Sequence, residues 1–165
     1  MRSMTLCAAA VLITACGGST GRYVDERASF ETASPSARSS LEISRIGTYA
    51  NSGIHSPRRL VIRGEQEWRE FWYDMDLGSP PEIDFNRDMV IAVAGGSRPT
   101  TGYSVLVNDV RLEEDGTLRV EILETTPGRG CVTGQQMTNP VDIVVVRRSD
   151  LRTWSFTDRR VVQDC

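Results

Sequence analysis

Lysine is absent from the 165-residue sequence and histidine occurs once, as His55, so all nineteen basic residues are arginine. Without lysine the chain cannot form a Schiff base or a P-loop, and one histidine excludes a zinc site built from several imidazoles. The formal net charge of −3 also lacks the basic excess that neutralises nucleic-acid phosphates. The composition therefore argues against an enzyme and against a nucleic-acid partner.

Long apolar runs are also scarce, and the one near the N-terminus, residues 5–14, is too short to remain in a membrane. Ten residues of helix rise about 15 Å, whereas the hydrocarbon core is about 30 Å thick. Because the run follows Arg2, it is typical of a secretory signal peptide, which we expect to cover residues 1–15.

The end of this run, ITAC at residues 13–16, resembles the lipobox of bacterial lipoproteins. The resemblance implies that cleavage precedes Cys16 and that lipid, palmitate included, is attached to this residue. Gly17 follows rather than aspartate, which in Gram-negative lipoproteins goes with sorting to the outer membrane. We therefore expect a lipid-anchored protein of the cell envelope that faces the periplasm. A plain signal peptide with an incidental cysteine is the alternative.

The four cysteines have separate expected fates. Cys7 leaves with the signal peptide and Cys16 carries lipid, so two thiols remain in an oxidising compartment. We predict a disulfide between Cys131 and Cys165, which would close a loop of about 34 residues and stabilise the fold by about 3–4 kcal/mol. The alternative is a reactive thiol at Cys131, for which His55 would be the only imidazole base.

The mature chain divides into two parts. Residues 16–40 are rich in Ser, Gly, Thr and Ala without apolar periodicity, which predicts a flexible tether with a reach of about 25–30 Å. Residues 41–165 contain the apolar patterns of a folded domain.

One amphipathic helix is expected at about residues 65–76. Trp68, Phe71, Trp72 and Met75 recur at helical spacing, so they form one apolar stripe that we expect to cap one end of the core. A ligand platform is the alternative interpretation of these aromatic residues.

The remaining apolar patterns have the period or the length of strands. We expect strands at residues 41–46, 59–63, 89–94, 142–147 and 154–162, and a hairpin over residues 103–124. Six or seven strands with one helix predict a mainly-β fold, either an antiparallel β-sandwich or an open barrel.

The loop at residues 95–103 is the candidate partner-binding site. Its glycines and its proline predict a shaped conformation, and an arginine and an aromatic residue on such a loop are typical binding anchors. A structural turn with Tyr103 packed inward is the alternative. The candidate binding residues are Arg98, Pro99, Thr100, Thr101, Gly102 and Tyr103.

From residue 68 to residue 146 the order of features resembles the C-terminal domain of the PrcB family. The shared features are a Trp-containing helix, PEIDF at residues 81–85, an apolar strand, RPTTGYS at residues 98–104, and Asn-Pro before a Val-rich strand. Thr101 stands where the family leads us to expect glycine. The resemblance implies a secreted accessory protein that binds or stabilises a protease and has no active site of its own.

A second resemblance concerns a shorter stretch. PTTGY at residues 99–103 is similar to the first binding loop of chagasin-type inhibitors, which wedge three loops into the cleft of a cysteine protease. A Gly-rich loop at residues 128–134 and Arg-Thr-Trp at residues 152–154 follow in the expected order. Arg98 and Thr153 replace the expected Asn and Pro. This resemblance implies an inhibitor of cysteine proteases as the alternative function.

Two further classes of function have weaker support. A hydrolase could pair Ser97 or Ser104 with His55, but the sequence has no nucleophile elbow. Acidic residues at 74–76, 84–88 and 113–115 could suggest a calcium site, which needs six to eight converging oxygens. Residues 84–88 lack the glycine and the closing glutamate of a calcium loop, and residues 113–115 lie on an expected hairpin turn, where acidic side chains stay solvated. We therefore expect no catalytic residue, no cofactor and no metal, and we expect a binding module.

Overall fold

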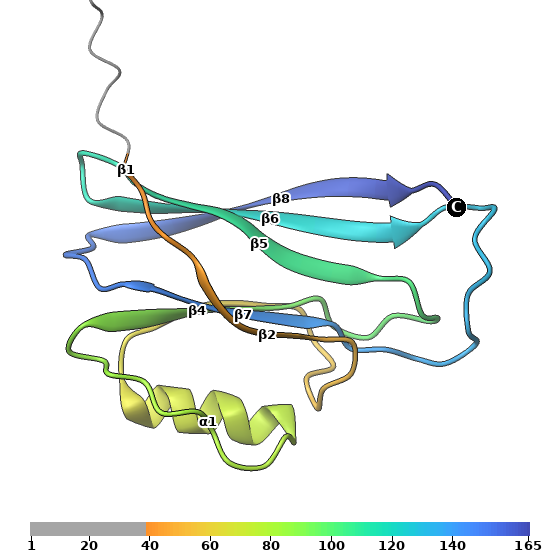
Figure 1. Ribbon diagram of the computed structural model, residues 1–165, viewed down its shortest axis with the longest axis horizontal. Helices are drawn as coiled ribbons and strands as arrows, with labels where there is room; N and C mark the ends of the chain where they lie inside the picture. Colours follow the sequence, from red (N-terminus) through yellow and green to blue (C-terminus); the bar gives the residue numbers. More distant parts are fainter. Residues whose placement is uncertain (1–38) are drawn as a thin grey trace, which may run out of the picture. The chain divides into compact units, whose positions relative to one another are not determined.

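Eight strands and one helix form the part of the chain that the structure, a computed structural model, describes, namely residues 39–165 (Figure 1). The expected signal peptide, the expected lipidation site Cys16 and the expected tether up to residue 38 lie outside the described residues. The helix is α1 (Glu65–Met75). The strands are β1 (Ser39–Ser40), β2 (Ser44–Tyr49), β3 (Arg58–Ile62), β4 (Asp88–Ala94), β5 (Ser104–Leu112), β6 (Thr117–Pro127), β7 (Val141–Arg147) and β8 (Thr153–Gln163).

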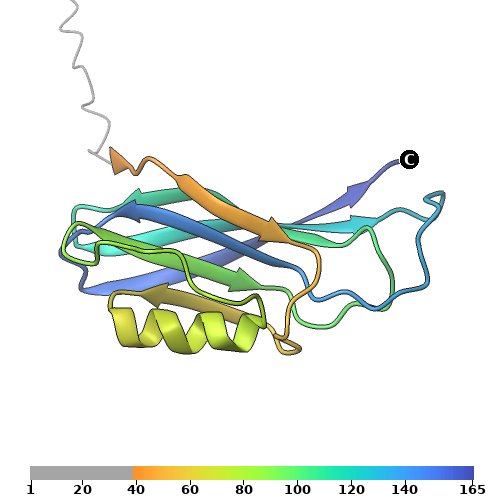
Figure 2. The ribbon, with the colours of Figure 1, turned by 60° about the horizontal axis from the view of Figure 1, so that its bottom comes forward.

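The strands form two four-stranded sheets that pack face to face (Figures 1 and 2). Sheet A has the strand order β1-β5-β6-β8, and sheet B has the order β2-β7-β4-β3. Neither sheet closes into a barrel, so the mainly-β prediction is confirmed and the sandwich is the observed architecture.

One strand pair differs from the expected antiparallel arrangement. β8 pairs with β6 in parallel along its whole length, whereas the other pairs are antiparallel. The connection explains the difference: after β6 the chain enters sheet B as β7 and then returns to sheet A as β8 (Figure 1). Two reversals of direction leave β8 running the same way as β6.

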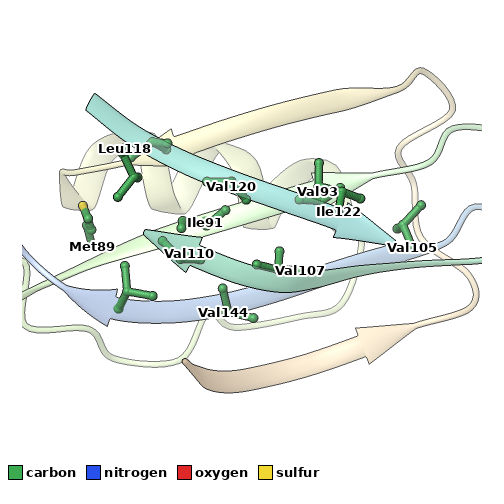
Figure 3. Packing of buried hydrophobic residues seen from close by; sticks show 12 residues of the cluster. Met89, Ile91, Val93, Val105, Val107, Val110, Leu118, Val120, Ile122 and Val144 are labelled. Atoms are coloured by element: carbon green, nitrogen blue, oxygen red, sulfur yellow. The ribbon is translucent and has the colours of Figure 1, made fainter. Parts of the chain in front are cut away.

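The main core lies between the two sheets, and a second core lies between sheet B and α1. Sheet B is thus covered on both faces, and a strand covered on both faces needs apolar residues at nearly every position. This explains the continuous apolar sequences of β4 and β7. Buried side chains between the sheets include Met89, Ile91, Val93, Val105, Val107, Val110, Leu118, Val120, Ile122 and Val144 (Figure 3).

Helix α1 lies along the outer face of sheet B (Figure 2), and its aromatic stripe packs against the side chains of that face. Trp68, Phe71, Trp72 and Met75 are all buried, and the indole Nε1 of Trp68 donates to the carbonyl oxygen of Pro81 at 2.9 Å. The stripe belongs to the core, but the expectation that it caps one end was wrong, since it covers a sheet face. Among residues 39–165, no helix is long and apolar enough to cross a membrane.

The segment from β1 to β2 passes from sheet A to sheet B. The backbone N–H of Leu41 donates to the carbonyl oxygen of Val110 in β5 at 2.8 Å, while β2 pairs with β7. Leu41 and Ile43 pack against the core between the sheets. The strand expected at residues 41–46 is therefore displaced toward residue 49, because residues 41–43 make the crossing.

Candidate functional site

The loop expected to bind a partner, residues 95–103, connects β4 to β5 at one end of the sandwich. Loop 128–140, which connects β6 to β7, lies at the same end, as does the C-terminus (Figure 1). The two loops pair directly: the N–H of Arg98 donates to the carbonyl of Thr138 at 2.8 Å, and the N–H of Thr138 donates to the carbonyl of Arg98 at 3.0 Å. We call these two loops together the loop end.

Threonine side chains extend the pairing between the loops. The N–H of Gly134 donates to Oγ1 of Thr101 at 2.7 Å, and the N–H of Thr101 donates to the carbonyl of Gly134 at 3.1 Å. Oγ1 of Thr138 donates to the carbonyl of Thr100 at 3.1 Å. Thr101, the residue that departs from the family pattern, therefore joins the two loops, which glycine at this position could not do through a side chain.

Two glycines allow the sharp path of loop 95–103. Gly96 has a φ of 71°, and a Cβ there would lie 2.8 Å from Cδ of Pro57. Gly102 has a φ of 91°, and a Cβ there would lie 3.2 Å from Cβ of Pro127. Both positions combine left-handed backbone with close neighbours, so the loop has a conformation that requires glycine twice.

Arg98 and Tyr103 contact each other across the loop. The guanidinium carbon of Arg98 lies 5.7 Å from the centroid of the Tyr103 ring, within the range of a cation–π interaction. The same guanidinium lies 3.9 Å from Oε1 of Glu124. Tyr103 is half-buried, so its position is intermediate between the exposed anchor and the inward-packed residue that the sequence left open.

The side chains that the loop end presents to solvent belong mainly to loop 128–140. Val132 is fully exposed and Met137 is about two-thirds exposed, whereas Thr138 beside it is buried. In loop 95–103, Pro99 is exposed and its neighbours are partly covered. Val132 and Met137 are therefore the large apolar side chains that the described loop end offers for contact with another molecule.

A disulfide connects Cys131 with Cys165, with 5.1 Å between their Cα atoms. Nearby, the N–H of Gly128 donates to the carbonyl of Gln163 at 3.0 Å. Together these bonds attach loop 128–140 to the end of β8. Because both sulfurs are bonded, Cys131 does not offer the thiolate that the reactive-cysteine alternative requires.

His55, Ser97 and Asn139 lie together at the loop end. Nδ1 of His55 is 3.3 Å from Oγ of Ser97, and that hydroxyl donates to Oδ1 of Asn139 at 2.8 Å. A hydroxyl has one proton, so Ser97 directs it at the amide and the imidazole must act as the donor. This geometry differs from the nucleophile–base pair of a hydrolase, in which the imidazole accepts the serine proton. Ser104 begins β5 instead.

The acidic clusters make local hydrogen bonds and ion pairs. Oδ1 of Asp84 accepts the N–H of Asn86 at 3.1 Å, and Arg58 donates to Asp74 at 2.6 Å. Hydrogen bonds from the side chain and the backbone of Thr117 lower the pKa of Asp115. Within residues 39–165, no group of three or more His, Cys, Asp or Glu side chains is arranged to hold a metal ion.

The three loops that resemble a chagasin-type inhibitor do not meet. Loops 95–103 and 128–134 share one end of the sandwich, but the turn at residues 148–152 lies at the other end. There the N–H of Arg152 donates to the carbonyl of Gly116, in the β5–β6 turn, at 2.9 Å. An inhibitor that wedges three loops into one cleft needs them at one end, so this geometry does not support the inhibitor hypothesis.

A charged hollow, which the sequence analysis missed, lies beside the loop end. Successive inward positions of β6 are the buried Leu118, Val120 and Ile122, and Glu124 occupies the next inward position. A carboxylate that continues an apolar face was the available signal, because it requires a cationic partner. The residues that line the hollow include Pro57, Arg59, Arg98, Glu124, Asp158 and Arg160.

Residues 89–147 match the family model described as PrcB C-terminal, so this part of the chain is similar to that domain. The matched range runs from β4 through β7 and includes both loops of the loop end. Helix α1 and residues 81–85, which belong to the resemblance seen in the sequence, lie outside it. No curated protein and no solved structure matches the chain significantly. The family match suggests an accessory role in a protease complex.

Proposed function

We propose that the protein is an envelope lipoprotein and a non-catalytic binding module that binds or stabilises an extracytoplasmic protease through its loop end. One observation carries the proposal: loops 95–103 and 128–140 are hydrogen-bonded into one surface, and both lie within the range that matches the PrcB C-terminal family. Exposed Val132 and Met137 on this surface provide apolar contact area for a protein partner.

The proposed anchor is a lipid on Cys16, which would hold the domain at the periplasmic face of the outer membrane. Cys16→Ser should abolish metabolic incorporation of an alkyne-labelled palmitate and move the protein from the membrane fraction to the soluble fraction. Cys7→Ser should change neither, because that residue lies within the expected signal peptide. Labelling that persists in Cys16→Ser would contradict the anchor.

The binding site is tested by capture from the protein's own envelope extract, with mass spectrometry to identify what is retained. The wild-type chain should retain a protease, and the double variant Val132→Asp with Met137→Ser should lose it, because two charged or polar groups replace exposed apolar contacts. Tyr73→Ser is the matched control, since the exposure of Tyr73 lies between those of Met137 and Val132 but the residue is on α1.

Two results would contradict the proposal. One is a set of captured proteins that contains no protease, and the other is protease capture that the double variant retains in full. Thr101→Ala is unsuitable for this test, because Thr101 joins the two loops and its loss would change the surface as well as the contact.

A further inference from the structure

The charged hollow beside the loop end contains more positive than negative groups. Three guanidinium groups, those of Arg59, Arg98 and Arg160, surround the carboxylates of Glu124 and Asp158. The hollow therefore carries an excess of one positive charge, although the whole chain has a formal net charge of −3. This excess is available to a ligand only if some of the arginine donors are unoccupied.

Arg59 is fully engaged within the protein. Its guanidinium donates to the carbonyl of Ala94 at 2.7 Å, to Oε1 of Glu124 at 2.7 Å and to Oδ1 of Asp158 at 3.0 Å. It also donates to the carbonyl of Arg58. Arg59 is thus a structural link between β3 and sheet A, and its side chain is only 18% exposed.

Arg98 and Arg160, in contrast, keep free donors. The shortest contact of each with a carboxylate is to Glu124, at 3.9 Å from Nη2 of Arg98 and at 3.6 Å from Nε of Arg160. Both distances are longer than a hydrogen bond. Within residues 39–165, neither side chain makes a shorter contact with a polar atom. Arg160 is 81% exposed, so its guanidinium is accessible to solvent.

A carboxylate is the ligand that fits two partly free guanidinium groups. The guanidinium fork binds the two oxygens of a carboxylate through parallel charge-assisted hydrogen bonds. One carboxylate also neutralises the single excess charge. A nucleic acid would instead bring a row of phosphates to a hollow that already contains Glu124 and Asp158, on a chain of net negative charge.

We infer that this hollow binds an acidic side chain, Asp or Glu, of a partner protein between Arg98 and Arg160. The inference rests on the proposed function and adds the chemistry of the partner, an acidic segment that contacts the loop end. Binding leaves the fold intact, because the incoming carboxylate displaces only the two long contacts of Glu124. The 2.7 Å bond from Arg59 to Glu124 remains.

The test uses the full chain and two fluorescein-labelled capped octapeptides, one alternating Glu with Ser and one alternating Gln with Ser. Fluorescence anisotropy should show saturable binding of the Glu peptide and binding of the Gln peptide that is at least about tenfold weaker, which corresponds to one charge-assisted contact. Raising the salt concentration from about 50 mM to about 500 mM should weaken the Glu peptide several-fold.

The variants Arg160→Gln and Arg159→Gln form a matched pair. They are neighbours in β8 and remove the same charge, but Arg159 lies on the opposite face of sheet A, near Glu121 at 4.0 Å. Arg160→Gln should weaken the Glu peptide by about fivefold or more, and Arg159→Gln should change it by less than about twofold. Arg160→Glu should reverse the preference in favour of a Lys peptide.

Several outcomes would overturn the inference. They are equal binding of the Glu and Gln peptides, equal losses in the two Gln variants, the absence of saturation, and tighter binding of a single-stranded oligonucleotide than of the Glu peptide. These results concern the hollow alone. The capture experiment with Val132 and Met137 concerns the loop end as a whole, so failure of the proposed function can be told from failure of this inference.

Discussion

Both lateral edges of the sandwich have an arginine–carboxylate ion pair between the sheets, but the two ion pairs differ in burial. Sheet B has two edge strands, β2 and β3, and each carries an arginine that reaches sheet A: Arg45 on β2 and Arg59 on β3. The carboxylate beside Arg45 is fully buried, whereas those beside Arg59 are 12% and 42% exposed. The two ion pairs therefore differ in how completely their polar groups must be satisfied within the protein.

At the β2 edge the ion pair closes the fold. Asp142 accepts from Nε of Arg45 at 2.9 Å, from Oγ1 of Thr48 at 2.8 Å and from the backbone N–H of Val107 at 2.7 Å. Arg45 in turn donates to the carbonyl of Val107 at 2.8 Å. The outer N–H and C=O of Val107, next to a bulge in β5, are thereby satisfied and cannot pair with a foreign strand.

At the β3 edge the charges remain partly in water. Glu124 and Asp158 share the guanidinium of Arg59, while Arg98 and Arg160 stand at longer distances with donors to spare. A buried pair must be satisfied completely, since each unpaired group costs several kcal/mol. A half-exposed cluster can retain free donors because water satisfies them. The donors of Arg98 and Arg160 at the β3 edge are therefore the ones that the proposed acidic ligand would use.

Substitution of the buried Asp142 should destabilise the protein more than any change at the β3 edge. Asp142→Asn keeps the shape but replaces one acceptor oxygen with a donor facing other donors, so we expect a loss of about 3–5 kcal/mol in the free energy of unfolding. Denaturant unfolding of the oxidised chain measures it. Asp88→Asn, whose 3.5 Å ion pair with Arg147 lies at the surface, is the control and should lose less than about 1 kcal/mol. Equal losses would contradict the comparison.

Removal of the disulfide should have the next largest effect. The double variant Cys131→Ser with Cys165→Ser opens a loop of 34 residues in sequence separation. The chain-entropy model gives a destabilisation of about 3–4 kcal/mol. The disulfide attaches loop 128–140 to β8, the strand of sheet A that contributes Asp158 and Arg160 to the β3 edge. Its removal should therefore accelerate hydrogen exchange in β8 and loop 128–140 more than in β2. Uniform acceleration would show that the bond does not stabilise that edge in particular.

At the β3 edge, two carboxylates that bind the same arginine can be compared for the effect of exposure on stability. Glu124 and Asp158 both accept from Nη2 of Arg59, at 2.7 and 3.0 Å, and Asp158 also accepts from Nε at 3.1 Å, but Glu124 is 12% exposed and Asp158 is 42% exposed. We expect Glu124→Gln to cost about 1–2 kcal/mol and Asp158→Asn less than about 1 kcal/mol in unfolding free energy. Equal costs, or a larger cost for Asp158→Asn, would mean that exposure does not set the strength of these pairs.

The sequence predicted those parts of the fold that depend on local periodicity. The stripe of α1 and the continuous apolar run of β4 repeat at the spacing of their elements, so both were placed at nearly the observed residues. The parallel pairing of β8 with β6 was missed because strand order depends on contacts distant in sequence, which periodicity does not encode.

The candidate site was predictable only as a loop. Gly96, Gly102 and Pro99 indicate a shaped segment from their backbone restrictions, but nothing local shows that Thr101 bonds Gly134. The aspartate of β7 was a signal that went unused: a carboxylate within DIVVVR, a run otherwise buried, requires donors from elsewhere in the fold. Arg45 supplies them from a strand 97 residues away in sequence.

The smallest expected effect concerns Asp115, in the β5–β6 turn, whose carboxylate is fully exposed. The side chain and backbone N–H of Thr117 hydrogen-bond the ionised form and lower its pKa in the folded state below the value of an unfolded chain. A lowered folded pKa means that Asp115 contributes stability above the unfolded pKa and loses it as the pH falls through the folded pKa. The unfolding midpoint of wild type should therefore fall slightly more than that of Asp115→Asn between about pH 5 and pH 2. Thr117→Val, which keeps the backbone bond, should remove only part of this difference. Identical pH profiles for wild type and Asp115→Asn would mean that an exposed carboxylate contributes no stability even with two hydrogen bonds. The stability that a carboxylate contributes would then depend more steeply on its burial than the ion pairs at the two edges indicate.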